Sequence, residues 1–202
     1  MAAVCRLLRC CAVLLTLVAF NSHAMMRYVV SAFRTPAERA LWMYAIQRPD
    51  IAELAKVLGS SNVNPNFMAT VWDGKWPECH EAMTPLAMAA VCGNMPVVHA
   101  LMASSKVDID CGGYTAVQHG GVEVTCLDRA ARLVQEMQRR IDAIRAAGVD
   151  PSIDGGHLGE SLQRELNIQR RIAQLLDEAG GKSALLDDDE LKRLLYEIEG
   201  VE

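Results

Sequence analysis

The sequence predicts an all-α fold built from consecutive pairs of packed helices, and three observations support this prediction. Apolar residues make up 51% of the 202-residue chain but aromatic residues only 5%, which favours helices packed through aliphatic side chains over an aromatic-rich β-sandwich. Residues 84–110 contain two apolar runs at helical spacing, separated by Gly-Asn. A similar pattern, an apolar helix followed by Ser-Ser and Val-polar-x-polar, occurs at both 49–66 and 93–110. A recurring helical unit of this kind indicates a repeat architecture.

The first 24 residues are typical of a secretory signal peptide. Two arginines precede an uncharged apolar run over 10–20, and a small-x-small cleavage pattern ends at Ala24. We therefore expect export, to a periplasm or to the cell exterior, with residues 1–24 removed. The alternative is an uncleaved membrane anchor at 10–26, although this window is shorter than the roughly 20 residues that span a bilayer.

The segment 84–103 carries the clearest helix signals in the chain. Thr84 is a good N-cap, and Pro85 suits the first helical turn, where its missing N–H is not needed. Gly93 and Asn94 are expected to end this helix, because both tolerate backbone conformations that other residues avoid. Each helix has an apolar face that only a neighbouring pair could bury. These faces comprise Leu86, Ala89, Ala90, Val97, Val98, Leu101 and Met102.

Two inserts between the predicted helix pairs, 66–83 and 111–124, are expected to form projecting hairpins. In the first insert, Asp-Gly between β-prone residues is a typical hairpin turn, and in the second, paired glycines flank alternating apolar positions. Exposed aromatic side chains are favoured binding anchors, so we predict that the hairpin tips contact a partner. The alternative is that the tryptophans pack back onto the first helices. The predicted partner-binding residues are Trp72, Lys75, Trp76, Tyr114 and His119.

The second half could fold in two ways. An apolar stripe without Gly or Pro covers 126–147, which is typical of one long helix. Residues 160–179 also lack a clear break, so an antiparallel pair of long helices joined by 148–159 is an alternative to further short pairs. Residues 185–202 are strongly acidic and are expected to form a C-terminal capping helix. The stripe comprises Leu127, Ala130, Val134, Met137, Ile141 and Ile144.

Charged residues in this half are expected to form a solvated surface. Two pairs, Asp128 with Arg132 and Glu136 with Arg140, have the i,i+4 spacing that stabilises a helix by a few tenths of a kcal/mol. The alternative is a patch for an anionic partner. That patch would be formed by Arg139, Arg140, Arg170 and Arg171.

The segment "TPLAMAAVCGNMPVVHALM" resembles the ankyrin repeat, whose pattern is Thr-Pro-Leu-His, two alanines, Gly-Asn or Gly-Asp, Val-Val and Leu-Leu. The segment "LLDEAGGKSA" resembles the end of a late repeat. The resemblance implies a solenoid of about four degenerate repeats over 25–184, which acts by binding other proteins. Ala87 and Cys126 stand where the pattern has His and Pro. The copies are also spaced more widely than the usual repeat of roughly 33 residues, which implies inserted loops.

Four cysteines lie beyond the predicted signal peptide. In an oxidising compartment they could form disulfides, and Cys79 with Cys111 is the preferred pair because both lie in inserts that have little core of their own. Cys111 with Cys126 is the next choice, and four reduced thiols are the alternative in a reducing compartment. No two of them have the CxxC spacing that favours zinc.

Taken together, these patterns favour a non-catalytic protein–protein interaction module. The sequence lacks a Gly-rich phosphate loop, Gly-x-Ser-x-Gly and His-Glu-x-x-His, so we predict no catalytic residues, metal or cofactor. The net charge of −5 and the absence of a long basic run argue against a nucleic-acid partner. We expect a monomer that binds another protein. The alternative is a membrane-tethered helical structural protein that keeps residues 10–26 as its anchor.

Overall fold

Helices dominate the fold, as the sequence predicts. The computed structural model describes residues 28–29, 35–47, 50–72, 80–115, 122–146 and 157–196. The predicted signal peptide or anchor therefore lies outside the described residues. Within those ranges, no helix is both long enough and apolar enough to cross a bilayer. The helices are α2 (Pro36–Ile46), α3 (Ile51–Gly59), α4 (Pro85–Val91), α5 (Met95–Met102), α6 (Cys126–Ala146), α7 (His157–Glu178) and α8 (Asp188–Tyr196).

The two inserts form hairpins, as predicted, and the hairpins join into one antiparallel sheet. Strand β2 pairs with β3 and β4 with β5, while Met83 of β3 lies opposite Gly113 of β4. This link between the hairpins was not predicted. It depends on Gly113, whose φ is 109° and where a Cβ would lie 2.0 Å from the carbonyl oxygen of Ala82. In spatial order the strands are β1 (Tyr28–Val29), β2 (Ala69–Trp72), β3 (His80–Met83), β4 (Gly113–Thr115) and β5 (Val122–Glu123).

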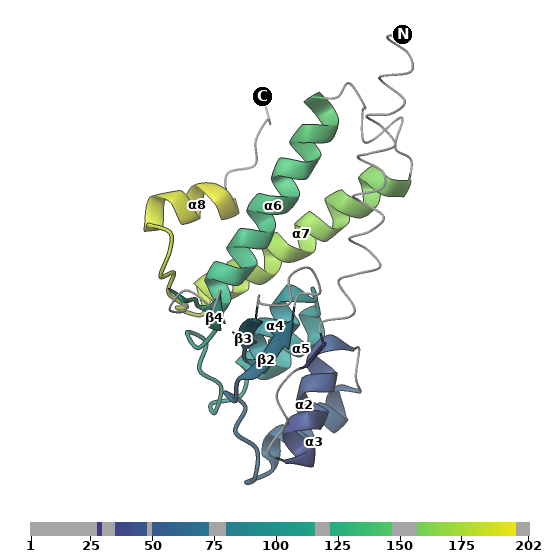
Figure 1. The fold of residues 1–202 in the computed structure, drawn as a ribbon, viewed down its shortest axis with the longest axis vertical. Helices are drawn as coiled ribbons and strands as arrows, with labels where there is room; N and C mark the ends of the chain where they lie inside the picture. The colour runs from purple at the N-terminus through teal and green to yellow at the C-terminus, as the bar shows by residue number, and fades with distance from the viewer. Residues whose placement is uncertain are drawn as a thin grey trace.

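The helices stack on one another in a regular order. Helix α2 packs on α4 and α4 packs on α6, while α3 packs on α5 and α5 packs on α7 (Figure 1). The helices thus form three rows: α2 with α3, α4 with α5, and the inner halves of α6 and α7. Each helix buries its apolar face against the corresponding helix of the next row, as amphipathic elements must do to escape water. One core runs through all three rows. It includes Leu41, Trp42, Leu54, Leu86, Val98, Leu101, Leu127, Ala131, Ile172 and Leu176.

Three threonines start the first helix of each row in the same way. The Oγ1 atoms of Thr35, Thr84 and Thr125 accept hydrogen bonds from the backbone N–H three residues later, at 3.1, 3.3 and 3.1 Å. Each bond satisfies one of the N–H groups that a helix N-terminus leaves without an intrahelical partner. The sequence analysis did not include Thr35 in the pattern, although Thr35-Pro36 repeats the Thr84-Pro85 dipeptide.

Side-chain amides cap the ends of α2 and α4 from the neighbouring row. The Nδ2 of buried Asn94 donates to the carbonyl oxygens of Tyr44 and Ala45, at 3.1 and 3.2 Å, and to that of Gln47. The Nε2 of buried Gln169, on α7, donates to the carbonyl oxygen of Val91 at 3.3 Å. Carbonyls at a helix C-terminus lack intrahelical partners, so these amides both complete the helix and fix the next row onto it.

The loops after α3, α5 and α7 are also joined from row to row. The Oδ1 of Asn66 accepts a hydrogen bond from the backbone N–H of Asp108 at 2.9 Å. One row further on, the Oδ1 of Asp110 accepts a hydrogen bond from the backbone N–H of Lys182 at 2.7 Å. Lys182, which bonds to Asp110, therefore follows α7 rather than α6.

In the second half, the alternative of two long helices is the one that the structure contains. Residues 126–146 form a single helix, α6, and α7 returns beside it in the opposite direction (Figure 1). The inner halves of both helices join the main core, whereas their outer halves project beyond the other rows and pack on each other. This outer pair has a separate small core, formed by Val134, Met137, Ile141, Ile144, Leu162 and Leu166.

The acidic C-terminal helix is present as α8, which packs on α6 and α7. Its buried residues are Leu191 and Leu195, and the carbonyl oxygen of Leu195 accepts a 2.7 Å hydrogen bond from the Nε2 of Gln174. The hydroxyl of Tyr196 donates to the Asp177 carboxylate at 2.8 Å. Helix α8 therefore covers the outer side of the last row with one apolar face.

Candidate functional site

A groove of about 310 Å³ lies between the sheet and the side of α6 that faces it. Its walls come from β3, β4 and the segment between β5 and α6, from the end of α4, from α6 as far as Arg140, and from the loop that precedes α8. A concave site where several elements meet is the usual position for ligand or partner binding. The lining residues are Glu81, Met83, Val91, Thr115, Val124, Asp128, Arg129, Arg132, Leu133, Glu136, Arg139, Arg140 and Leu185.

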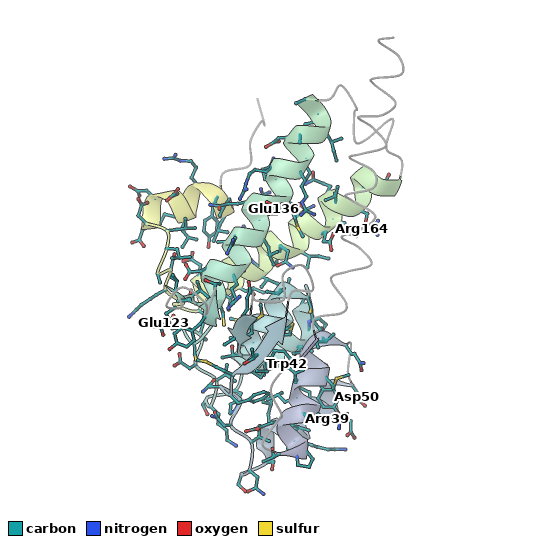
Figure 2. The ribbon with its side chains drawn as sticks, viewed as in Figure 1. Arg39, Trp42, Asp50, Glu123, Glu136 and Arg164 are labelled. Atoms are coloured by element: carbon teal, nitrogen blue, oxygen red, sulfur yellow. The ribbon has the colours of Figure 1, made fainter. Side chains whose placement is uncertain are left out.

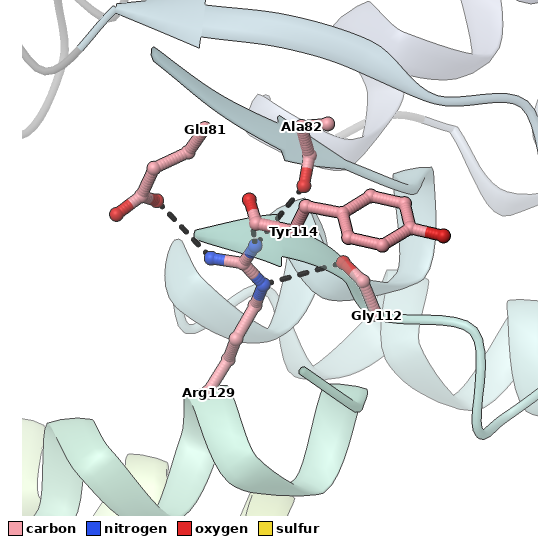
Figure 3. A network of polar contacts seen from close by, with 5 residues as sticks. All are labelled: Glu81, Ala82, Gly112, Tyr114 and Arg129. Atoms are coloured by element: carbon pink, nitrogen blue, oxygen red, sulfur yellow. Dashed lines mark hydrogen bonds and ion pairs between the residues drawn. The ribbon is translucent and has the colours of Figure 1, made fainter. Parts of the chain in front are cut away.

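Arg129 fixes the sheet wall of the groove to α6. Its guanidinium donates to the carbonyl oxygens of Gly112, Ala82 and Tyr114 at 3.2, 3.0 and 3.2 Å, and to the Glu81 carboxylate at 3.1 Å (Figure 3). The Arg129 side chain is only 6% exposed, so its charge must be compensated inside the protein. One planar guanidinium thus holds two adjacent strands, β3 and β4, at a fixed distance from the helix.

Asp128, the residue before Arg129, fixes the opposite wall. Its buried carboxylate accepts hydrogen bonds from the N–H and hydroxyl of Thr125, at 2.9 and 3.0 Å, which is the reciprocal half of a helix capping box. The same carboxylate accepts from the Ser183 hydroxyl at 2.6 Å and from the backbone N–H groups of Ala184 and Leu185. The loop before α8 is therefore tied to the first turn of α6.

The α6 wall carries the guanidiniums of Arg132, Arg139 and Arg140 and the carboxylate of Glu136. Glu136 bonds to both Arg139 and Arg140, at 3.3 and 2.9 Å, so two guanidiniums share one carboxylate. The predicted pair of Glu136 with Arg140 is confirmed. The predicted pair of Asp128 with Arg132 is wrong, because the Asp128 carboxylate is buried and turned toward the loop before α8. Exposed Arg132 forms no ion pair or hydrogen bond with any residue that the structure describes.

The floor and rim of the groove are apolar. Met83 and Val124 are buried beneath it, and Leu133 is half-buried in the α6 wall. Leu185, which also lines the groove, is 53% exposed, and Val122, the strand partner of groove-lining Thr115, is 55% exposed. Guanidinium groups beside exposed aliphatic surface are a composition that suits protein partners.

Of the residues predicted to bind a partner, only two have a described backbone. Trp72 lies on β2 opposite Tyr28 and His80, and Tyr114 lies on β4 with 38% of its surface exposed. Lys75, Trp76 and His119 fall outside the described residues, so their predicted contacts stay predictions. The side chain of Tyr114 does not line the groove. Neighbouring residues on a strand point to opposite faces, and Thr115 is the one that lines the groove.

The arginines of the predicted anionic-partner patch are separated in the structure. Arg139 and Arg140 line the groove, whereas Arg171 pairs with Glu178 on α7 at 3.1 Å. The sequence analysis did not single out Arg132 or Leu133 as site residues. Their signal was the helical spacing of 132, 136, 139 and 140, which places these residues along one side of α6.

The structure describes both cysteines of only one predicted disulfide, that of Cys111 with Cys126. Cys79 lies outside the described residues, so its pairing with Cys111 stays a prediction. Cys111 and Cys126 are both free thiols here, and the Sγ of Cys126 donates to the carbonyl oxygen of Cys111 at 3.5 Å. Burial raises the pKa of Cys126 to about 12. Burial and the nearby Asp108 also raise the pKa of Cys111. Both thiols are therefore poor nucleophiles near neutral pH.

Within the described ranges, no group of three or more His, Cys, Asp or Glu side chains is placed to hold a metal ion. Comparison of the chain with protein families, with curated proteins and with solved structures gave no match.

Proposed function

We propose that this chain is a non-catalytic protein-binding module, built as a short ankyrin-like array, which holds its partner in the arginine-lined groove. The proposal rests chiefly on one observation. Asp128 and Arg129, adjacent on the first turn of α6, fix the two opposite walls of the groove to the same helix. A site whose walls are fixed before binding loses little conformational entropy when a partner enters.

The recurring contacts between rows support the ankyrin-like part of the proposal. The threonine caps, the amide caps on α2 and α4, and the bonds between successive loops each recur from one row to the next. In this interpretation α2 with α3 is the first unit and α4 with α5 the second. The inner halves of α6 and α7 form the third unit, and their outer halves are an insertion within it.

The position of the groove supports the binding part of the proposal. In such an array, the hairpins and the first helix of each unit line one side of the solenoid, which is the side that repeat proteins use for recognition. The groove lies on this side, between β3 to β5 and α6. Its lining combines arginine with aliphatic side chains, and arginine is among the residues enriched at binding hot spots.

Site-specific photo-crosslinking tests this proposal in cells that express the chain. A photoreactive residue replaces Leu133 in the groove or, as the matched control, exposed Ile51 at the start of α3. We expect a discrete crosslinked protein adduct from position 133, which is lost when Arg132→Glu is added, and no such adduct from position 51. The same adduct pattern from both positions would refute the groove as the binding site.

Export is a separate part of the proposal and is supported by the residue pattern of 1–24. Intact-mass measurement of the protein recovered outside the cytosol tests it. We expect the mass of a chain that begins after Ala24. Recovery of the uncleaved chain in the membrane fraction would instead support the anchored alternative, with 10–26 retained.

A further inference from the structure

We propose that the groove recognises an acidic, extended peptide segment, in which a carboxylate side chain binds Arg132 and a neighbouring aliphatic side chain packs on Leu133 and Leu185. This inference rests on the proposed function, since it specifies the chemistry of the partner for the same groove. The observations that carry it are the guanidinium of Arg132, which has no partner among the described residues, and the aliphatic side chains of Leu133 and Leu185 that line the same groove.

The first step is the charge of the α6 wall. Each carboxylate in the groove is already engaged: Glu81 by Arg129, Glu136 by Arg139 and Arg140, and Asp128 by the loop before α8. No described residue forms an ion pair with Arg132, and its side chain is exposed. Within the described ranges, the groove therefore presents one guanidinium, that of Arg132, which has no carboxylate partner, while each groove carboxylate already has one.

The second step is the identity of the anion. A guanidinium presents its N–H groups in a planar fork that matches a carboxylate, with two parallel hydrogen bonds. Of the groove arginines, Arg129, Arg139 and Arg140 already contact carboxylates, and Arg132 alone has no ion pair with a described residue. One available guanidinium suits one carboxylate better than a polyanion with many phosphates.

The third step is the apolar part of the groove. Met83 and Val124 are almost fully buried beneath the groove, so the apolar surface that a ligand can reach belongs to half-buried Leu133 and to Leu185, which is 53% exposed. A bare phosphate or a sugar chain would leave this surface in contact with water. A peptide that alternates acidic and aliphatic residues would cover it, and each buried methylene contributes about 0.8 kcal/mol.

Fluorescence anisotropy with defined peptides tests the inference on the full chain. The probe is a fluorescein-labelled octapeptide that alternates Asp with Leu. One comparison peptide replaces every Asp with Asn, and another replaces every Leu with Ser. We expect the Asp-Leu peptide to bind, and we expect each comparison peptide to bind at least about tenfold more weakly, since each loses one of the two kinds of contact.

A matched pair of variants ties the binding to the groove. Arg132→Glu reverses the charge of the unpaired guanidinium, and Arg164→Glu makes the same change on exposed α7, outside the groove (Figure 2). Neither residue is buried, so both variants should fold. We expect Arg132→Glu to weaken binding of the Asp-Leu peptide at least about tenfold, and Arg164→Glu to leave it within about twofold.

Several results would overturn the inference. Equal binding of the Asn peptide would exclude carboxylate recognition, and equal binding of the Ser peptide would exclude the apolar contact. An equal loss in both charge-reversal variants, or equal competition by polyglutamate and heparin, would indicate non-specific attraction. If crosslinking from Leu133 still captures a partner while the Asp-Leu peptide does not bind, the inference fails and the proposed function survives. If neither occurs, both fail.

Discussion

The hydroxyl of Ser183 donates a 2.6 Å hydrogen bond to the buried carboxylate of Asp128, and so joins two positions 55 residues apart in the sequence. Because Asp128 also caps the start of α6, one carboxylate both begins the helix and anchors the loop that leads to α8. The adjacent Arg129 anchors the sheet from the same helical turn. The stability of the groove therefore depends on two neighbouring residues of opposite charge, and substitutions at each should have distinct effects.

Asp128→Ala should lower the free energy of unfolding by about 3 kcal/mol. The substitution removes the acceptor of several charge-assisted hydrogen bonds and leaves buried N–H groups without a partner. Ser183→Ala removes only one donor and should cost about 1 kcal/mol. Urea denaturation of the three proteins measures both values. A smaller loss for Asp128→Ala than for Ser183→Ala would contradict the central role of the carboxylate.

Arg129→Lys should destabilise the protein by about 2–3 kcal/mol although it preserves the charge. A lysine ammonium cannot reach the carbonyls of Gly112, Ala82 and Tyr114 together with Glu81, so buried acceptors would lose their donors. The same change at exposed Arg132 should alter stability by less than about 0.5 kcal/mol. Hydrogen exchange should show the loss of protection in β3 and β4. Unchanged exchange there would show that Arg129 does not hold the strands.

Much of the fold could be predicted from local sequence patterns. The Thr-Pro and Gly-Asn signals gave α4 and α5, and Asp-Gly and the paired glycines gave the two hairpins. These features depend on residues close together in the chain, where capping and turn chemistry are decisive. The third row could not be predicted. It consists of the start of α6 and the end of α7, and no local signal in 126–178 marks where the main core ends.

The candidate site was predicted less well than the fold. The sequence analysis favoured aromatic residues in the inserts, and it treated the charges of α6 as solvated surface. The groove exists only because the sheet, α6 and the loop before α8 meet, and those contacts span 47 residues between Arg129 and Ala82 and 55 between Asp128 and Ser183. Helical spacing placed Arg132 and Glu136 on one side of α6, but spacing alone could not show what that side would face.

Asn94→Asp should be more destabilising than Asn94→Ala. In the native protein, the Nδ2 of Asn94 donates to carbonyl oxygens at the end of α2. Alanine leaves those carbonyls without a donor, at a cost of about 1–3 kcal/mol. Aspartate adds a buried negative charge beside the negative end of the helix dipole and should cost more. Thermal unfolding measures the order, and a variant with Asp at 94 that is as stable as the one with Ala would contradict this geometry.

Ile141→Ala should loosen the outer halves of α6 and α7 without affecting the rest of the fold. Ile141 belongs to the small outer core, which is separate from the main core. Its truncation should cost about 2–4 kcal/mol of stability, and this cost should appear as local opening of the outer halves of α6 and α7. Leu101→Ala removes a fully buried side chain from the main core and should lower protection across α2 to α5. Native-state hydrogen exchange distinguishes the two. Uniform loss of protection in Ile141→Ala would show that both cores unfold together.

Ionisation of Cys126 should make the protein less stable as the pH rises from about 9 toward 12. Burial raises the pKa of this thiol from 9.0 to about 12, so above pH 9 the unfolded chain loses the Cys126 proton while the folded chain keeps it. The protonated thiol therefore favours the folded state fully below pH 9, and this contribution declines as the pH approaches 12.

Cys126→Ala removes this pH-dependent contribution, although it also leaves a small cavity. The difference in unfolding free energy between wild type and variant should consequently shrink between pH 8 and pH 10.5 in urea denaturation. Tyr196 and Cys111, whose pKa values are also raised, are present in both proteins and cancel in this comparison. A difference that stays constant over this range would show that the thiol ionises as readily in the folded chain as in the unfolded one.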